Sequence, residues 1–176
     1  THEKDGSLIH KKTGRRVAAV MPVYTIGMPA NMDSILKIAK GYNLPVVVDG
    51  AAALGSTFKG RSLGGLGGDL TVFSFNGNKT VTAGGGGAVV GENADLIKLV
   101  YHLSTTARVG ADYHHDRIGF NYRMTNIAAA VGCAQMERLE EFVAVKRKIQ
   151  QFYNGALENL PGVGLFPQPE WAEGAC

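Results

Sequence analysis

Short runs of apolar residues alternate with helical patterns along most of the chain. Unbroken apolar runs are typical of strands buried on both faces of a sheet, and they occupy residues 17–23, 45–48, 70–75 and 88–90. Apolar positions at helical spacing and capping residues predict helices, which cover residues 32–40, 94–103, 125–139 and 140–160. Strand, helix and strand at this spacing indicate βαβ units, and therefore an α/β fold with a mainly parallel sheet flanked by helices.

Both ends of the chain depart from this pattern. Residues 1–16 are polar and rich in turn signals, which predicts a hairpin or loop. A final short strand is predicted at residues 163–166, and nothing after it closes a domain. We therefore interpret the sequence as the internal part of a longer protein, incomplete at both ends.

Composition excludes several classes of protein. Hydrophobic residues make up 45% of the chain and charged residues 19%, as in ordinary globular proteins. The net charge of +3 is small and scattered, so no nucleic-acid partner is expected. The densest basic cluster flanks a Thr13-Gly14 turn, which favours a solvated hairpin, and it consists of Lys11, Lys12, Arg15 and Arg16.

The sequence also argues against a membrane protein. No apolar run approaches the ~20 residues that a spanning helix needs, and the N-terminus lacks a signal-peptide layout. Cys133 and Cys176 are far apart and form no CxxC pair. We expect Cys133 to be a buried free thiol because its neighbours are apolar, and a cytoplasmic location follows from this cysteine usage.

Asp49 follows an apolar strand at its carboxyl end, where open α/β sheets place their ligands. A carboxylate there must face a cleft, a cation or backbone N–H groups, because burying it unpaired is costly. Two interpretations remain open. Asp49 either binds a ligand or caps the segment that begins at Gly50.

Lys79 follows the next apolar strand, so the same edge of the sheet should carry it. A lone lysine there is most often a surface residue, but Ser74 precedes it and a glycine-rich stretch, residues 84–87, follows it. A lysine amine in a partly desolvated cleft has a lowered pKa and becomes a nucleophile toward a carbonyl. A serine hydroxyl and glycine N–H groups can hold a phosphate. With Asp49 as partner of a pyridinium nitrogen, these are the groups that a pyridoxal phosphate enzyme needs.

Other ligand sites fit the sequence less well. Lys79 precedes the glycines, which is the wrong order for a phosphate-binding P-loop, and no GxGxxG opens a helix after the first strand. The adjacent residues His114, His115 and Asp116 do not easily converge on one ion, so no metal site is expected. A generic nucleotide-binding α/β domain remains as an alternative.

Three segments of the chain match a known pattern, and they are VVVDGAAALGSTFKGRSLGGLGGDLTVFSFNGNKTVTAGGGGAVV, PVYTIGMPANMDSI and HHDRIGFNYRMTNIAAAVGCAQMERLEEF. They resemble the DegT/DnrJ/StrS aminotransferases, which are pyridoxal phosphate enzymes of the aspartate-aminotransferase fold (fold type I). The elements SFxxNK and GxNYRM are specific in this order and spacing. The resemblance covers about residues 17–160. It implies that residues 1–139 belong to the cofactor-binding large domain and residues 140–176 to a connecting helix and the start of a small C-terminal domain.

The resemblance also implies a role for each matching residue. Lys79 corresponds to the lysine that carries pyridoxal 5'-phosphate as a Schiff base and acts as general acid and base. Asp49 corresponds to the aspartate that pairs with the pyridinium nitrogen, and Ser74 to a serine on the cofactor phosphate. Asn121 corresponds to an asparagine that reaches the phosphate in the neighbouring subunit. A homodimer with shared active sites follows from that last role.

One position departs from the family. Three residues after the aspartate the family usually carries Gln, His or Glu against the cofactor ring, and here that position is Ala52. The change removes a ring contact and a hydrogen-bonding group, so the pocket is altered at this cofactor-binding position.

The resemblance implies a transaminase that moves an amino group, with glutamate as the expected donor, to a nucleotide-linked keto-deoxy sugar for polysaccharide biosynthesis. The alternative is a catalytically impaired or non-catalytic homologue that uses the fold for dimerisation. Related sugar dehydratases replace the lysine with histidine, so Lys79 argues against that reaction. The 176 residues alone are not expected to be active.

Overall fold

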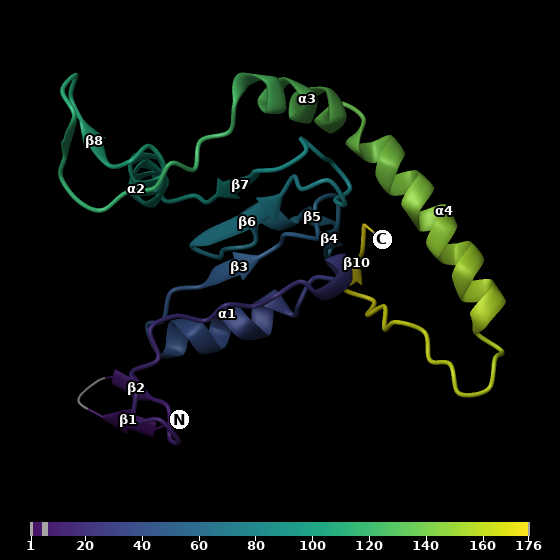
Figure 1. The fold of residues 1–176 in the computed structure, drawn as a ribbon. Coiled ribbons are helices and arrows are strands. Elements are labelled where there is room, and N and C mark those ends of the chain that lie inside the picture. The colour runs from purple at the N-terminus through teal and green to yellow at the C-terminus, as the bar shows by residue number, and fades with distance from the viewer. Residues whose placement is uncertain (1, 5–6, 176) are drawn as a thin grey trace.

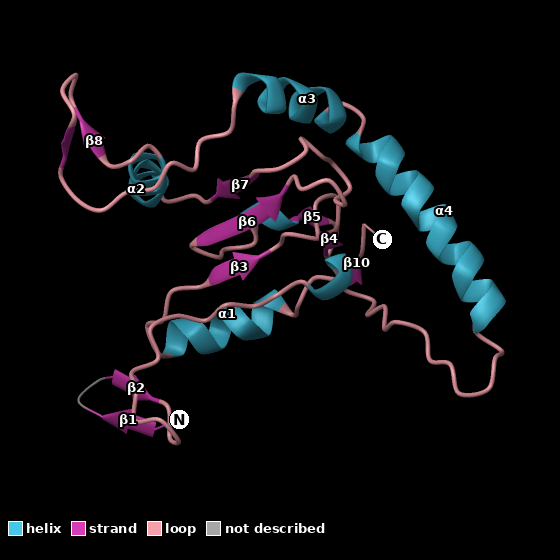
Figure 2. Cartoon of the chain, in the orientation of Figure 1, coloured by secondary structure: helices cyan, strands magenta, loops and turns pink. Residues whose placement is uncertain are grey.

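The computed structural model describes residues 2–4 and 7–175 and has the α/β architecture that the sequence predicts. A small central sheet lies between helix α1 on one side and helices α3 and α4 on the other (Figure 1). Helix α2 (Ala94–Ser104) and the hairpin of β8 (Arg108–Val109) and β9 (His114–His115) lie beyond one end of the sheet, on the side where the chain leaves β7 (Figure 2).

The central sheet contains three strands in the order β3-β6-β7. They are β3 (Val47–Asp49), β6 (Leu70–Ser74) and β7 (Gly87–Val90). Strands β3 and β6 are parallel, which confirms the predicted crossover between residues 45–48 and 70–75. Strand β7 runs antiparallel to β6, so the three named strands form a mixed sheet, and the isolated bridges from Val20 and Val23 extend its parallel side.

The first apolar run does not form the strand that the sequence predicts. Residues 17–23 make only isolated parallel bridges to the next segment, from Val20 to Val46 and from Val23 to Asp49. Met21 is 66% exposed and Val23 is 52% exposed. The prediction that this run is buried on both faces is therefore wrong, because one of its faces has no packing partner among the described residues.

Helix α1 (Met32–Gly41) begins and ends as predicted. The side chain of Asn31 caps it by accepting a hydrogen bond from the Ser34 backbone N–H at 3.2 Å. Its apolar face buries Met32 and Ala39 in the main core. That core also contains alternate residues of the neighbouring segments, and its fully buried side chains include Tyr24, Val46, Val48 and Phe58.

Three further helices follow the sheet, as the sequence predicts. They are α2 (Ala94–Ser104), α3 (Asn126–Met136) and α4 (Leu139–Leu157). The Asn93 side chain caps α2 by accepting hydrogen bonds from the backbone N–H groups of Asp95 and Leu96. The predicted domain break at residues 139 and 140 falls at the start of α4, and the division itself stays a prediction.

Cys133 in α3 is exposed, so the prediction of a buried thiol is wrong. Gly132 is the only residue of α3 that is fully buried. Apolar residues flank Cys133 in the sequence, but Ile127 is 81% exposed and Val131 is 47% exposed. Apolar neighbours in sequence therefore did not mean apolar neighbours in space, because the described chain places little against this helix.

The short strands lie in hairpins and at the chain ends. Strands β1 (His2–Lys4) and β2 (Ser7–Ile9) form the predicted N-terminal hairpin, and the basic cluster after it is exposed. Strands β4 (Thr57–Phe58), β5 (Arg61–Ser62) and β10 (Ala172–Glu173) form a second sheet. Residues 163–166 form no strand, so that prediction is wrong, and β10 occurs later in the chain. Among the described residues, no helix is long and apolar enough to cross a membrane.

Candidate active site

Asp49 and Ser74 lie on the same face of the central sheet. Asp49 pairs with Val72 in the parallel register of β3 and β6, and Ser74 follows Val72 by two residues. Because side chains alternate between faces along a strand, Asp49, Val72 and Ser74 share one face. All three are half-buried, whereas Val48 and Thr71 on the opposite face are fully buried. The more open face of the sheet therefore carries the predicted site residues.

Asp49 is held firmly by its backbone. Its N–H donates to the Pro22 carbonyl at 2.9 Å, and its own carbonyl accepts from the Tyr24 N–H at 2.9 Å. The carboxylate oxygen Oδ1 accepts from the Ala51 N–H at 3.0 Å. Asp49 therefore does cap the following turn. Within the described residues its second oxygen, Oδ2, has no hydrogen-bond partner, so the cap leaves one oxygen available to a ligand.

Ser74 and Lys79 stand at the two ends of a tight turn after β6. The Ser74 Oγ atom accepts from the Asn76 N–H at 3.2 Å, and the Lys79 N–H donates to the Asn76 carbonyl at 3.0 Å. Lys79 is half-buried. Its Nζ atom makes no hydrogen bond or ion pair with the part of the chain that the structure describes.

The loop that carries Lys79 is anchored on both sides. The Phe75 carbonyl accepts from the Ala83 N–H at 2.9 Å, and the Phe75 N–H donates to the Gly86 carbonyl at 2.9 Å. Val81, which is part of this loop, is fully buried. A Cβ atom on Gly87 would lie 2.3 Å from the Phe73 carbonyl oxygen. Glycine there lets the returning backbone approach β6, so the loop and its lysine keep a fixed position.

Ala52 lies in the turn that follows Asp49. The turn is closed by a hydrogen bond from the Ala53 N–H to the Gly50 carbonyl at 2.8 Å. The Ala52 methyl group is half-buried and has no polar atom. Whether a cofactor ring contacts it stays a prediction.

The structure does not bring Asn121 to the other three residues within this chain. Asn121 is exposed and bridges Thr105 beyond the end of α2. In Figure 1, α2 lies on the side of the sheet away from the arrowheads of β3 and β6, the strands that end at Asp49 and Ser74. The role of Asn121 in a neighbouring subunit stays a prediction.

Two large cavities lie elsewhere in the described part of the chain. One, of about 690 Å³, lies between the segment 53–57 and α4. The other, of about 840 Å³, lies between β7, α2 and residues 122–125. Neither is lined by Asp49, Ser74 or Lys79. Asp49 and Ser74 therefore lie on the more open face of the sheet, and Lys79 lies in the loop that follows β6, outside both of these cavities.

Two features of the structure were not predicted from the sequence. The hydroxyl of Tyr24 is buried without a partner among the described residues, and burial raises its pKa to about 12. His102 contacts Asp116, and their hydrogen bond holds the pKa of the Asp116 carboxyl below its usual value. The described residues contain no group of three or more His, Cys, Asp or Glu side chains suited to a metal. Nothing in the spacing of His102 and Asp116 indicates their pairing.

Comparison with known proteins identifies the family of the chain. The model of the DegT/DnrJ/EryC1/StrS aminotransferase family matches residues 1–175. The chain belongs to this family. It is similar to GDP-perosamine synthase of Escherichia coli O157:H7, with 41% identity over 91% of this chain and 44% of that protein.

Solved structures of the family share the fold. The aminotransferase TlmJ from Streptoalloteichus hindustanus superposes with a TM-score of 0.85 at 27% identity, over 94% of this chain and 46% of that one. DesI, solved in the presence of its TDP-sugar product, superposes with a TM-score of 0.82 at 32% identity, over 94% of this chain and 42% of DesI. The chain therefore has the fold of these aminotransferases over the part that superposes. The chain spans less than half the length of these family members.

Proposed function

We propose that the whole protein is a pyridoxal phosphate-dependent transaminase that transfers an amino group to a nucleotide-linked keto-deoxy sugar. The observation that carries the proposal is the register of β3 and β6, which puts Asp49 and Ser74 on one sheet face just before the Lys79 turn. Family membership supports the same reaction class.

The groups present fit pyridoxal phosphate. The cofactor needs an amine to bind it covalently, a carboxylate for its pyridinium nitrogen and donors for its phosphate. Lys79 offers an amine without a competing ion pair among the described residues, and Asp49 offers the free oxygen Oδ2. The Ser74 hydroxyl accepts from Asn76, which leaves its own O–H to donate to a phosphate. When bound, the cofactor supplies an electron sink for the carbon that gains or loses the amino group.

Each residue then has one task. Once the amine of the donor had displaced it from the cofactor, Lys79 Nζ would move a proton from the donor's carbon to the cofactor in the first half of the reaction and from the cofactor to the sugar's carbon in the second half. Asp49 keeps the ring nitrogen protonated through its negative charge, and its two backbone hydrogen bonds hold it in place. Ser74 fixes the phosphate, and Ala52 leaves space beside the ring where other family members place a polar side chain.

The substrate class rests on the relatives. GDP-perosamine synthase is named for a nucleotide-linked sugar, and DesI was solved in the presence of its TDP-sugar product. We propose the same class of substrate here, with glutamate as the amino donor. We also propose a cytoplasmic homodimer in which Asn121 reaches the cofactor phosphate of the neighbouring subunit. Residues 1–139 would belong to the cofactor-binding domain and residues 140–176 to the connection toward a second domain.

Replacing Lys79 by alanine in the whole protein tests the proposal. Lys79→Ala should lose both the visible absorbance of lysine-bound cofactor and all turnover, because no other amine lies in the anchored loop. Lys37→Ala, in an exposed position on α1, serves as control and should keep both. Retained absorbance in Lys79→Ala contradicts the assignment. A native protein without cofactor absorbance favours the non-catalytic homologue.

A further inference from the structure

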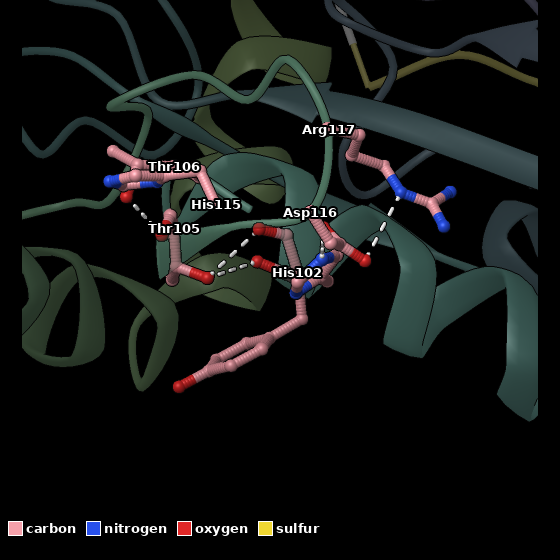
Figure 3. Close-up of polar contacts among 7 residues, drawn as sticks. His102, Thr105, Thr106, His115, Asp116 and Arg117 are labelled. Carbon is pink, nitrogen blue, oxygen red and sulfur yellow. Dashed lines mark hydrogen bonds and ion pairs between the residues drawn. The ribbon is translucent and has the colours of Figure 1, made fainter. Parts of the chain in front are cut away.

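Side chains at the end of α2 and in the following hairpin form a polar cluster (Figure 3). His102 Nε2 lies 2.7 Å from Asp116 Oδ1, and Arg117 Nε lies 3.5 Å from Asp116 Oδ2. The His102 side chain is 27% exposed and the Asp116 side chain is 36% exposed. The cluster thus joins α2 to residues far along the hairpin, and none of the proposed catalytic steps uses it.

The same contact region fixes the backbone on both sides of Asn121. The Phe120 N–H donates to the Leu103 carbonyl at 2.7 Å, and the Tyr122 N–H donates to the Ser104 carbonyl at 3.0 Å. Asn121 itself bridges Thr105. The position of Asn121 is therefore set by how residues 119–122 lie against the end of α2.

This contact is tight and strained. Thr106 and Ala107 have φ values of 66° and 52°, which non-glycine residues rarely adopt because their Cβ atoms crowd the backbone. A Cβ atom on Gly119 would lie 2.3 Å from the Thr106 carbonyl carbon, so only glycine can pass there. Strained backbone persists only where neighbouring interactions hold it.

The polar cluster supplies those interactions. His115 Nδ1 lies 2.7 Å from the Thr106 carbonyl oxygen, and the Asp116 N–H donates to the Ala107 carbonyl at 3.2 Å. The ion pair of Asp116 with His102 closes the loop back onto α2. Removing that pair frees residue 116 from α2, and the strained segment 105–107 loses one of its restraints.

We propose that His102 and Asp116 are positioning residues that hold Asn121 in the geometry it needs to bind the cofactor phosphate. The proposal rests on the proposed function, in which Asn121 reaches that phosphate in the neighbouring subunit. His102 and Asp116 touch neither cofactor nor substrate in this scheme and act only through residues 119–122.

The test compares Asp116→Ala with Asp95→Ala in the whole protein. Asp95 is a carboxylate on the same helix as His102, and its side chain is 92% exposed. Asp116→Ala should raise the dissociation constant of pyridoxal phosphate about tenfold, the scale seen when a residue that orients a ligand is lost. It should also speed amide hydrogen exchange at Phe120 and Tyr122. Asp95→Ala should change neither.

A double-mutant cycle with Asn121→Ala separates positioning from a general loss of stability. If Asp116 acts through Asn121, the two substitutions together should weaken cofactor binding no more than Asn121→Ala alone. Additive losses, or an unchanged dissociation constant in Asp116→Ala, overturn the proposal. Wild-type affinity in Asn121→Ala also overturns it. The absorbance test on Lys79 involves neither residue, so it decides the proposed function separately.

Discussion

Ser56 and Ala175, which are 119 positions apart, are joined by a buried hydrogen bond. The Ala175 N–H donates to Ser56 Oγ at 2.8 Å, and the Ser56 hydroxyl donates to the Gly27 carbonyl at 2.6 Å. Ser56 is 3% exposed and Ala175 is fully buried. One hydroxyl thus connects the segment after β3, the loop before α1 and the segment after β10.

Replacing Ser56 by alanine should destabilise the protein. The substitution leaves a buried N–H and a buried carbonyl without partners, and each such group costs about 1–3 kcal/mol. We expect the free energy of unfolding, measured by chemical denaturation, to fall by at least the cost of one such group, about 1–3 kcal/mol. Ser62→Ala is the control, because Ser62 is exposed and makes no side-chain cap. Equal effects of both substitutions contradict the role of the buried hydroxyl.

The contact of His102 with Asp116 should make the stability of the fold depend on pH in the acidic range. The hydrogen bond from His102 holds the pKa of Asp116 below its usual value of 3.8, and the charges of His102 and Arg117 add to this effect. A carboxyl whose pKa is lower in the folded state stabilises the fold above its unfolded pKa. That contribution is lost as the pH falls from 3.8 through the lower folded value.

The matching measurement is the free energy of unfolding as a function of pH. Wild-type protein should lose more stability on acidification than Asp116→Asn, because the amide cannot titrate. Asp95→Asn controls for the removal of one carboxylate from the same region. Parallel pH profiles of wild type and Asp116→Asn contradict a folded-state interaction of Asp116.

Local patterns allowed much of the fold to be predicted. Helix α1 has an amphipathic face, and Asn31 caps it, so its start could be placed from residues that lie next to one another. Strands β3 and β6 are short apolar runs and pair in parallel as predicted, although the segment between them holds β4 and β5 and no α-helix. Their edge therefore carried Asp49 and Ser74 together, as the sequence predicts.

The remaining features depend on packing partners that local sequence does not contain. The run 17–23 is apolar throughout, yet Met21 is exposed because no described element covers it. Cys133 is exposed for the same reason. The contact of His102 with Asp116 depends on how the hairpin folds back over α2. Motif resemblance, rather than periodicity, singled out Asn121.

The identity of the lysine that binds the cofactor is the central claim. The whole protein is loaded with pyridoxal phosphate, the bond between cofactor and lysine is reduced with borohydride, and the peptides are analysed by mass spectrometry. We predict that the cofactor is attached to Lys79 and that Lys37, on the exposed side of α1, is unmodified. Attachment to another lysine, or to none, contradicts the account.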